Sequence, residues 1–122
     1  MMNRRGFVAG AVSLVALGAM AALPPQEQLR IERLIKAVEA RKDMKFIRNG
    51  TEYDCADAAK FLRGKLEAMG KEVTSARDFI ERIASRSSMS GEPYHVKFAD
   101  GKTMLANQFL TEELKRLEGH PA

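Results

Sequence analysis

Residues 80–94 read IERIASRSSMSGEPY, and they join the two kinds of secondary structure that the sequence predicts. On the C-terminal side, Tyr94, Val96 and Phe98 alternate with polar residues, which is the period of a half-buried strand. On the N-terminal side, apolar residues recur at helical spacing, at Ala76, Phe79, Ile80, Ile83 and Ala84. The other, solvent-facing side of this helix is expected to carry Arg77, Asp78, Glu81, Arg82, Ser85 and Arg86. The stretch therefore predicts a helix, a polar loop and then a strand.

The rest of the chain supplies three more helices and two hairpin turns. Asn49-Gly50 tolerates the positive φ angles of a type I′ turn, and Asp100-Gly101 predicts a second turn. Thr74 or Ser75 is expected to cap the helix that precedes the serine-rich loop. The predicted segments are helices at 26–42, 55–69, 75–86 and 106–118, with hairpins at 45–54 and 94–105. This order predicts one α+β domain over 22–122, whose two short β-hairpins either form one antiparallel sheet or pack separately.

Residue types that hold metals or form disulfides are scarce. A single cysteine, Cys55, excludes an intrachain disulfide, and its place on the apolar face of the second helix predicts a buried thiol. Asp54, directly before it, is expected to cap that helix with its side chain. The only histidines are His95 and His120, which lie far apart in the sequence. We therefore expect no metal site and no cofactor.

Residues 1–21 have the pattern of a cleavable secretory signal peptide. Arg4 and Arg5 precede an uncharged run over 7–23, in which Ala19-Met20-Ala21 places small residues at the spacing that a signal peptidase reads. The run is 17 residues long, which is marginal for a membrane span, and an uncleaved anchor is the alternative. We expect a periplasmic protein that meets the membrane only through this leader.

The leader also resembles a twin-arginine export signal. Asn3-Arg4-Arg5-Gly6-Phe7-Val8 has the paired arginines and, one residue later, a phenylalanine and an aliphatic residue. The usual serine before the pair and lysine after it are missing. Both the twin-arginine route and the general secretory route therefore stay open.

The charge of the chain argues against nucleic acid as a partner. The whole sequence carries 20 basic and 16 acidic residues, a net charge of +4. Two of the basic residues, Arg4 and Arg5, belong to the leader, so the remaining domain has 18 basic and 16 acidic residues and a net charge of +2. Nucleic-acid binding calls for a concentrated basic face, which this balance does not predict.

The loop after the third helix is the candidate binding site. Arginine guanidinium groups and serine hydroxyls are suitable donors for carboxylate or phosphate, and the tip of the first hairpin could reach the same groove. The structural alternative is that Arg86 satisfies the last helix carbonyls while the serines make local turns, because a helix C-terminus repels anions. The candidate ligand-binding residues are Arg48, Tyr53, Arg82, Arg86, Ser87, Ser88, Ser90, Gly91 and Tyr94.

A serine hydrolase is the enzymatic alternative. Its nucleophile would come from Ser87, Ser88 or Ser90, with His95 as the base and Asp100 or Asp54 to orient it. No nucleophile-elbow sequence surrounds these serines, and His95 is expected to face solvent from its strand. No residue is assigned a catalytic role on this pattern.

Two stretches carry a resemblance to a known family. They are FIRNGTEYDCADAAKFLRGKLEAMG at 46–70 and FIERIASRSSMSGEPY at 79–94. In these stretches, and over about 29–117 as a whole, the sequence resembles the YfeK-like family of small exported bacterial proteins. The resemblance implies an exported domain without an established activity, and it supplies no catalytic residues. A twin-arginine leader would be a departure from that family.

These observations favour a non-enzymatic binding or accessory module of the cell envelope. Its expected partner is an envelope protein or a small polar or anionic ligand, held by the serine-rich loop. An extended partner strand could also add to the edge of a small sheet. The competing interpretation is a purely structural envelope protein.

Overall fold

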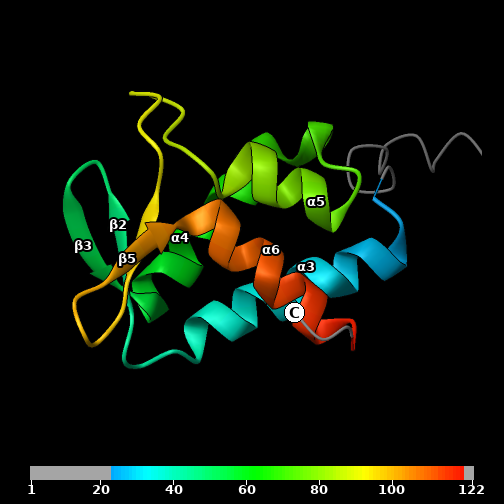
Figure 1. Ribbon diagram of the computed structural model, residues 1–122. Helices are drawn as coiled ribbons and strands as arrows, with labels where there is room; N and C mark the ends of the chain where they lie inside the picture. The colour runs from blue at the N-terminus through cyan, green and yellow to red at the C-terminus, as the bar shows by residue number, and fades with distance from the viewer. Residues whose placement is uncertain (1–22, 120–122) are drawn as a thin grey trace, which may run out of the picture.

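The computed structural model describes residues 23–119, so the predicted leader at 1–21 and His120 lie outside the described residues. Within 23–119, no helix is both long and apolar enough to cross a membrane. The domain has α+β architecture, as predicted, with its sheet at one end and helices extending away from it (Figure 1).

The helices agree closely with the predicted segments. Helix α3 spans Pro25–Glu39, α4 spans Cys55–Met69 and is followed by the short turn η1 at Gly70–Glu72, and α6 spans Ala106–Leu117. The third predicted helix consists of α5, Ala76–Asp78, which continues directly into a wider helical turn, η2, at Phe79–Ile83. Gly119 has a φ of 83° just after α6, a backbone conformation that glycine allows at a helix end.

The two hairpins form one antiparallel sheet. The strands are β2 at Lys45–Arg48, β3 at Thr51–Asp54, β4 at His95–Lys97 and β5 at Thr103–Leu105, in the order β3-β2-β4-β5. Strand β2 pairs with β4 so that Phe46 lies opposite Val96. This pairing joins residues 48 to 52 positions apart in the sequence and brings the start of β4 beside the first hairpin.

The turn between β2 and β3 forms as the sequence predicts. Asn49 has a φ of 51° and Gly50 a φ of 80°, so both central residues take the positive φ angles of a type I′ turn. This turn fixes the register in which Phe46 lies opposite Tyr53. It also projects Asn49 at the tip of the hairpin.

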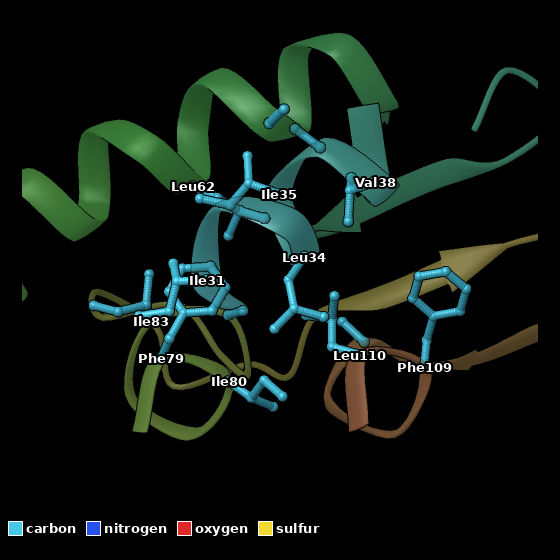
Figure 2. Close-up of a cluster of buried hydrophobic side chains, with 14 of the residues drawn as sticks. Ile31, Leu34, Ile35, Val38, Leu62, Phe79, Ile80, Ile83, Phe109 and Leu110 are labelled. Atoms are coloured by element: carbon cyan, nitrogen blue, oxygen red, sulfur yellow. The ribbon is translucent and has the colours of Figure 1, made fainter. Parts of the chain in front are cut away.

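Helix α3 lies at the centre of an aliphatic core. Its apolar side contributes Ile31, Leu34, Ile35 and Val38, all buried. These side chains meet residues from α4, η2 and α6 (Figure 2). The surrounding side chains include Leu62, Phe79, Ile80, Ile83, Phe109 and Leu110. The apolar sides of α3, α4, η2 and α6 therefore converge on a single core.

The end of the third helix differs from the prediction. Ser75 caps α5 as expected, since its hydroxyl accepts a hydrogen bond from the Asp78 N–H at 3.0 Å. Ser85, expected on the solvent side, is buried, and its hydroxyl donates to the Ile80 carbonyl at 2.6 Å. The reason is the wider turn of η2, in which the Ala84 N–H bonds back to the Phe79 carbonyl, five residues earlier. That change of pitch rotates Ser85 toward the core.

Replacing Ser85 with alanine is expected to lower the free energy of unfolding by about 1–2 kcal/mol, because a buried carbonyl loses its partner. Urea unfolding would measure the change. Ser88→Ala is the matched control, since Ser88 is an exposed serine of the same segment. Equal stability of the two variants would contradict the assignment.

Asp54 does not cap α4 with its side chain. Its backbone takes the N-cap conformation, but no capping hydrogen bond forms, and the carboxylate instead accepts from Lys45 Nζ at 2.5 Å. Cross-strand pairing explains the difference, because Lys45 and Asp54 are directly opposite in the hairpin.

Cys55 is buried as predicted. Its thiol donates to the Met44 carbonyl at 3.2 Å, and burial raises the pKa of the thiol.

Candidate functional site

The tip of the first hairpin is hydrogen-bonded to the serine-rich loop. The Asn49 side-chain amide donates to the Ser87 hydroxyl at 3.4 Å, and the Ser90 hydroxyl donates to the Asn49 side-chain oxygen at 2.6 Å. In Figure 1 this loop, between η2 and β4, rises beside the β2–β3 hairpin. Asn49 therefore serves both the turn and the contact between two distant segments.

Ser87 and Gly91 shape the loop. Ser87 is buried, and its hydroxyl accepts from the N–H groups of Met89 and Ser90 at 3.2 and 3.3 Å. Gly91 has a φ of 76°, and its N–H donates to the Ser87 carbonyl at 2.9 Å. Ser88, Met89 and Ser90 remain exposed. The loop is thus a preformed turn that presents its outer residues to solvent.

A buried lysine lies beneath this loop. Lys65, on α4, is only 9% exposed, and its ammonium donates to the Arg86 carbonyl at 2.8 Å and to the Tyr94 hydroxyl at 3.1 Å. Within the described residues, no carboxylate lies within ion-pair distance of it. Burial, and then the charge of Arg48, lower the pKa of Lys65. This is a cation whose protein partners are all uncharged.

The hydrogen-bonding capacity around Lys65 is incompletely used. An ammonium group has three donors, and one remains after the bonds to Arg86 and Tyr94. Burial raises the pKa of Tyr94, so its hydroxyl keeps a hydrogen of its own. No residue within 23–119 accepts from that hydroxyl. The remaining donors suit a ligand that offers oxygen acceptors, above all a carboxylate or a phosphate.

Arg48 places a second positive charge near Lys65. Its guanidinium carbon lies 4.2 Å from the ring centroid of Phe61 and 5.3 Å from that of Tyr53. It also donates to the Tyr53 hydroxyl at 3.4 Å, a long contact. Stacking on aromatic rings fixes the plane of a guanidinium while leaving donors on its edge free.

These residues line an open groove of about 450 Å³, a size within the range of small-molecule sites. No acidic residue contributes to its lining, so its charge is positive. The groove is bounded by the hairpin tip, α4 and the serine-rich loop. Its lining consists of Arg48, Asn49, Phe61, Gly64, Lys65, Met69, Ser87, Ser88, Met89 and Tyr94.

Several predicted site residues lie outside the lining of this groove. Arg82 pairs with Glu72 at 3.3 Å beside a different hollow. Arg86 contributes its carbonyl to Lys65 and pairs through its backbone with Pro93. Tyr53 contacts Arg48 but lines a neighbouring hollow of about 190 Å³. The groove therefore unites Arg48, Ser87, Ser88 and Tyr94 of the predicted set.

Sequence reasoning missed Lys65, Phe61 and Gly64. A signal for Lys65 was present, because it follows Ala58 and Leu62 at helical spacing and so falls on the buried side of α4. A charged residue on an apolar helix side is unusual enough to single out. No comparable signal marks Phe61 as the stacking partner of Arg48.

The serine-hydrolase arrangement gains no support from the geometry. No hydrogen bond joins His95 to a serine of the loop within the described residues. His95 alternates with Tyr94 and Val96 along the strand, so it faces away from the core side of the sheet. Asp54 pairs with Lys45, and Asp100 accepts from the Lys102 N–H.

A larger hollow, of about 520 Å³, lies between α3 and α4 on another face. Its lining is mostly aliphatic, and two of its charged residues, Arg63 and Glu32, are paired with each other at 2.6 Å. Within 23–119, no group of three or more His, Cys, Asp or Glu side chains is placed to hold a metal ion. The groove at Lys65 is therefore the better candidate for specific binding.

Comparison with known proteins shows to which family this chain is similar. A family of unknown function, DUF5329, matches residues 25–118. The uncharacterized protein YfeK of Salmonella typhimurium is 38% identical over 81 residues, which cover 66% of this chain and 68% of that protein. No solved structure matches the chain. The match over 25–118 includes every described helix and strand, and the chain belongs to the DUF5329 family.

Proposed function

We propose that this protein is an exported, non-enzymatic binding module of the cell envelope, which holds an anionic group of its ligand in the groove at Lys65. The observation that carries the proposal is a buried lysine whose ammonium group lacks a carboxylate partner within the described residues. Export is inferred from the leader pattern at 1–21.

The energetics of burial favour an anion at this position. Removing a charge from water is costly unless an opposite charge or several hydrogen bonds compensate it. Two neutral oxygens and the nearby rings of Tyr94 and Phe61 compensate Lys65 without an opposite charge, and Arg48 adds charge of the same sign. A carboxylate or phosphate would accept charge-assisted bonds from Lys65 and from the free edge of Arg48. Binding would then relieve repulsion between two cations.

A purely structural role for Lys65 is the competing explanation. In that case the lysine would only fasten the serine-rich loop to α4 through the Arg86 carbonyl. The explanations differ in what they expect of Arg48, which holds no part of the loop by a hydrogen bond. A ligand role requires the guanidinium charge, whereas a fastening role does not.

Benzoate and inorganic phosphate are suitable probes, added to the purified protein at constant ionic strength and followed by backbone amide NMR. We expect shifts confined to residues that line the groove. Arg48→Gln should weaken binding at least fivefold, since it removes one of the two charges. Arg82→Gln is the matched control, because Arg82 lies outside the groove. Equal binding by both variants, or shifts on another face, would overturn the proposal.

Anion affinity should depend on pH in a way that reports Lys65. The lowered pKa of Lys65 means that this amine loses its proton below the usual lysine value of 10.5. The raised pKa of Tyr94 keeps that hydroxyl neutral over the same range. Benzoate affinity is therefore expected to be constant near neutral pH and to fall as pH rises through the lowered pKa of Lys65, below 10.5. A flat profile up to pH 10.5, the ordinary lysine value, would contradict a role for the Lys65 charge.

Export can be tested separately in a bacterial host. The protein should be recovered from the envelope fraction with a new N-terminus near residue 22, as read by mass spectrometry. Replacing Arg4 and Arg5 with lysine should abolish export by the twin-arginine route and leave the general secretory route working. An intact N-terminus in the cytoplasmic fraction would contradict export.

A further inference from the structure

The fold does not require a glycine at position 64, in the middle of α4. Gly64 is exposed within Cys55–Met69, and a Cβ added there would meet nothing within 4 Å. Its φ is not in the positive region that demands glycine. Glycine is nevertheless among the poorest helix formers. Because Gly64 lines the groove directly before Lys65, the space that it leaves opens onto the proposed binding surface.

The groove beyond Lys65 has an apolar character. Met89 is 97% exposed at the outer edge of the loop, and Met69 is 42% exposed on α4. Both line the groove, together with the ring of Phe61. Methionine side chains are flexible and adapt to apolar ligands of varied shape. Of these three side chains, which we call the apolar strip, Phe61 lies at the charged end, against the Arg48 guanidinium, and Met69 lies one helical turn after Lys65 on α4.

The polar groups along this strip are largely engaged already. Both ends of the Asn49 amide are bonded, to Ser87 and to Ser90, and the Ser87 hydroxyl accepts from two backbone N–H groups. The Ser88 hydroxyl contacts Met69 sulfur at 3.4 Å. A peptide backbone laid here would find few direct hydrogen-bond partners among these groups. An apolar body needs no such partners.

We propose that the groove binds an amphiphilic carboxylate, a carboxylate carried on an alkyl chain, with its head at Lys65 and Arg48 and its chain across Gly64 between Phe61, Met69 and Met89. This inference rests on the proposed anion site and adds the chemical class of the ligand. Charge complementarity fixes which end of the ligand meets Lys65. The open backbone at Gly64 lets the chain approach the helix closely.

Calorimetric titration of the purified protein with butanoate, hexanoate and octanoate tests the inference. Affinity is expected to rise roughly twofold for each added methylene, since each buries apolar surface against an open groove. Octanamide, which keeps the chain and loses the charge, should bind at least tenfold more weakly than octanoate. Gly64→Leu should weaken octanoate at least fivefold. Ala56→Leu, at an exposed position of the same helix outside the groove, should not.

The outcomes separate this inference from the proposed function. Equal affinities for butanoate and octanoate would overturn the alkyl-chain assignment and leave the anion site standing. Octanamide binding as tightly as octanoate would overturn both. Octanoate binding equally to Gly64→Leu and Ala56→Leu would overturn the placement across Gly64. If N-acetyl-dileucine bound more tightly than octanoate, and if amidation of its C-terminus abolished that binding, the groove would be assigned to peptide C-termini. That result would overturn the alkyl ligand.

Discussion

Replacing Leu34 with alanine is expected to lower the free energy of unfolding by about 3–4 kcal/mol, the largest loss of stability that we predict for a single change. Leu34 is fully buried on α3, where the apolar sides of the other helices converge (Figure 2). Truncation removes apolar contacts and leaves a cavity that a close-packed core fills only partly. A domain of about 100 residues has a total stability of only about 5–15 kcal/mol, so this variant should unfold far more easily.

Urea unfolding followed by circular dichroism would measure this loss. Leu29→Ala is the matched control, because Leu29 lies on the same helix but is 53% exposed. That variant should lose less than about 1 kcal/mol. A loss at Leu34 no larger than the loss at Leu29 would mean that α3 does not form the centre of the core.

Lys65→Met is expected to reduce benzoate affinity at least tenfold while leaving stability within about 1 kcal/mol of the wild type. Methionine has a similar length and fits a half-apolar site without a charge. Removing a poorly compensated buried cation is favourable, and this gain offsets the hydrogen bonds lost at Arg86 and Tyr94. The positive charge of Lys65 therefore favours anion binding but contributes little to the stability of the fold.

Lys60→Met is the matched control for this experiment, since Lys60 is an exposed lysine of the same helix. Calorimetric titration and urea unfolding should be carried out on both variants. Loss of several kcal/mol of stability with unchanged benzoate affinity would show that Lys65 only fastens the loop. That result would remove the main support for the proposed anion site.

Local sequence patterns were sufficient to predict the helices and strands of this fold. The stripe of Ile31, Leu34, Ile35 and Val38 marks the buried side of α3 because a helix repeats every 3.6 residues. Asn49-Gly50 predicts its turn because few other residues accept positive φ at both positions. The helical period predicts Ser85 on the solvent side, but the wide turn of η2 breaks that period and Ser85 is buried.

The candidate site was predictable only in part. The serine-rich loop and Arg48 were recognised from their residue types, and the structure places Arg48, Ser87, Ser88 and Tyr94 around one groove. Arg82 was grouped with them because it is close in sequence, yet Glu72 holds it on another surface. Nearness along a chain does not decide on which side of a helix end a charged residue lies.

The sequence by itself determined most of the buried helix positions and the places where the chain turns. Only the tertiary structure decided that β2 pairs with β4, that the serine-rich loop meets the hairpin tip, and that Lys65 is buried without a carboxylate among the described residues. The physical reason is that periodicity and turn propensity depend on neighbouring residues, whereas the partners of a buried charge depend on contacts between distant segments.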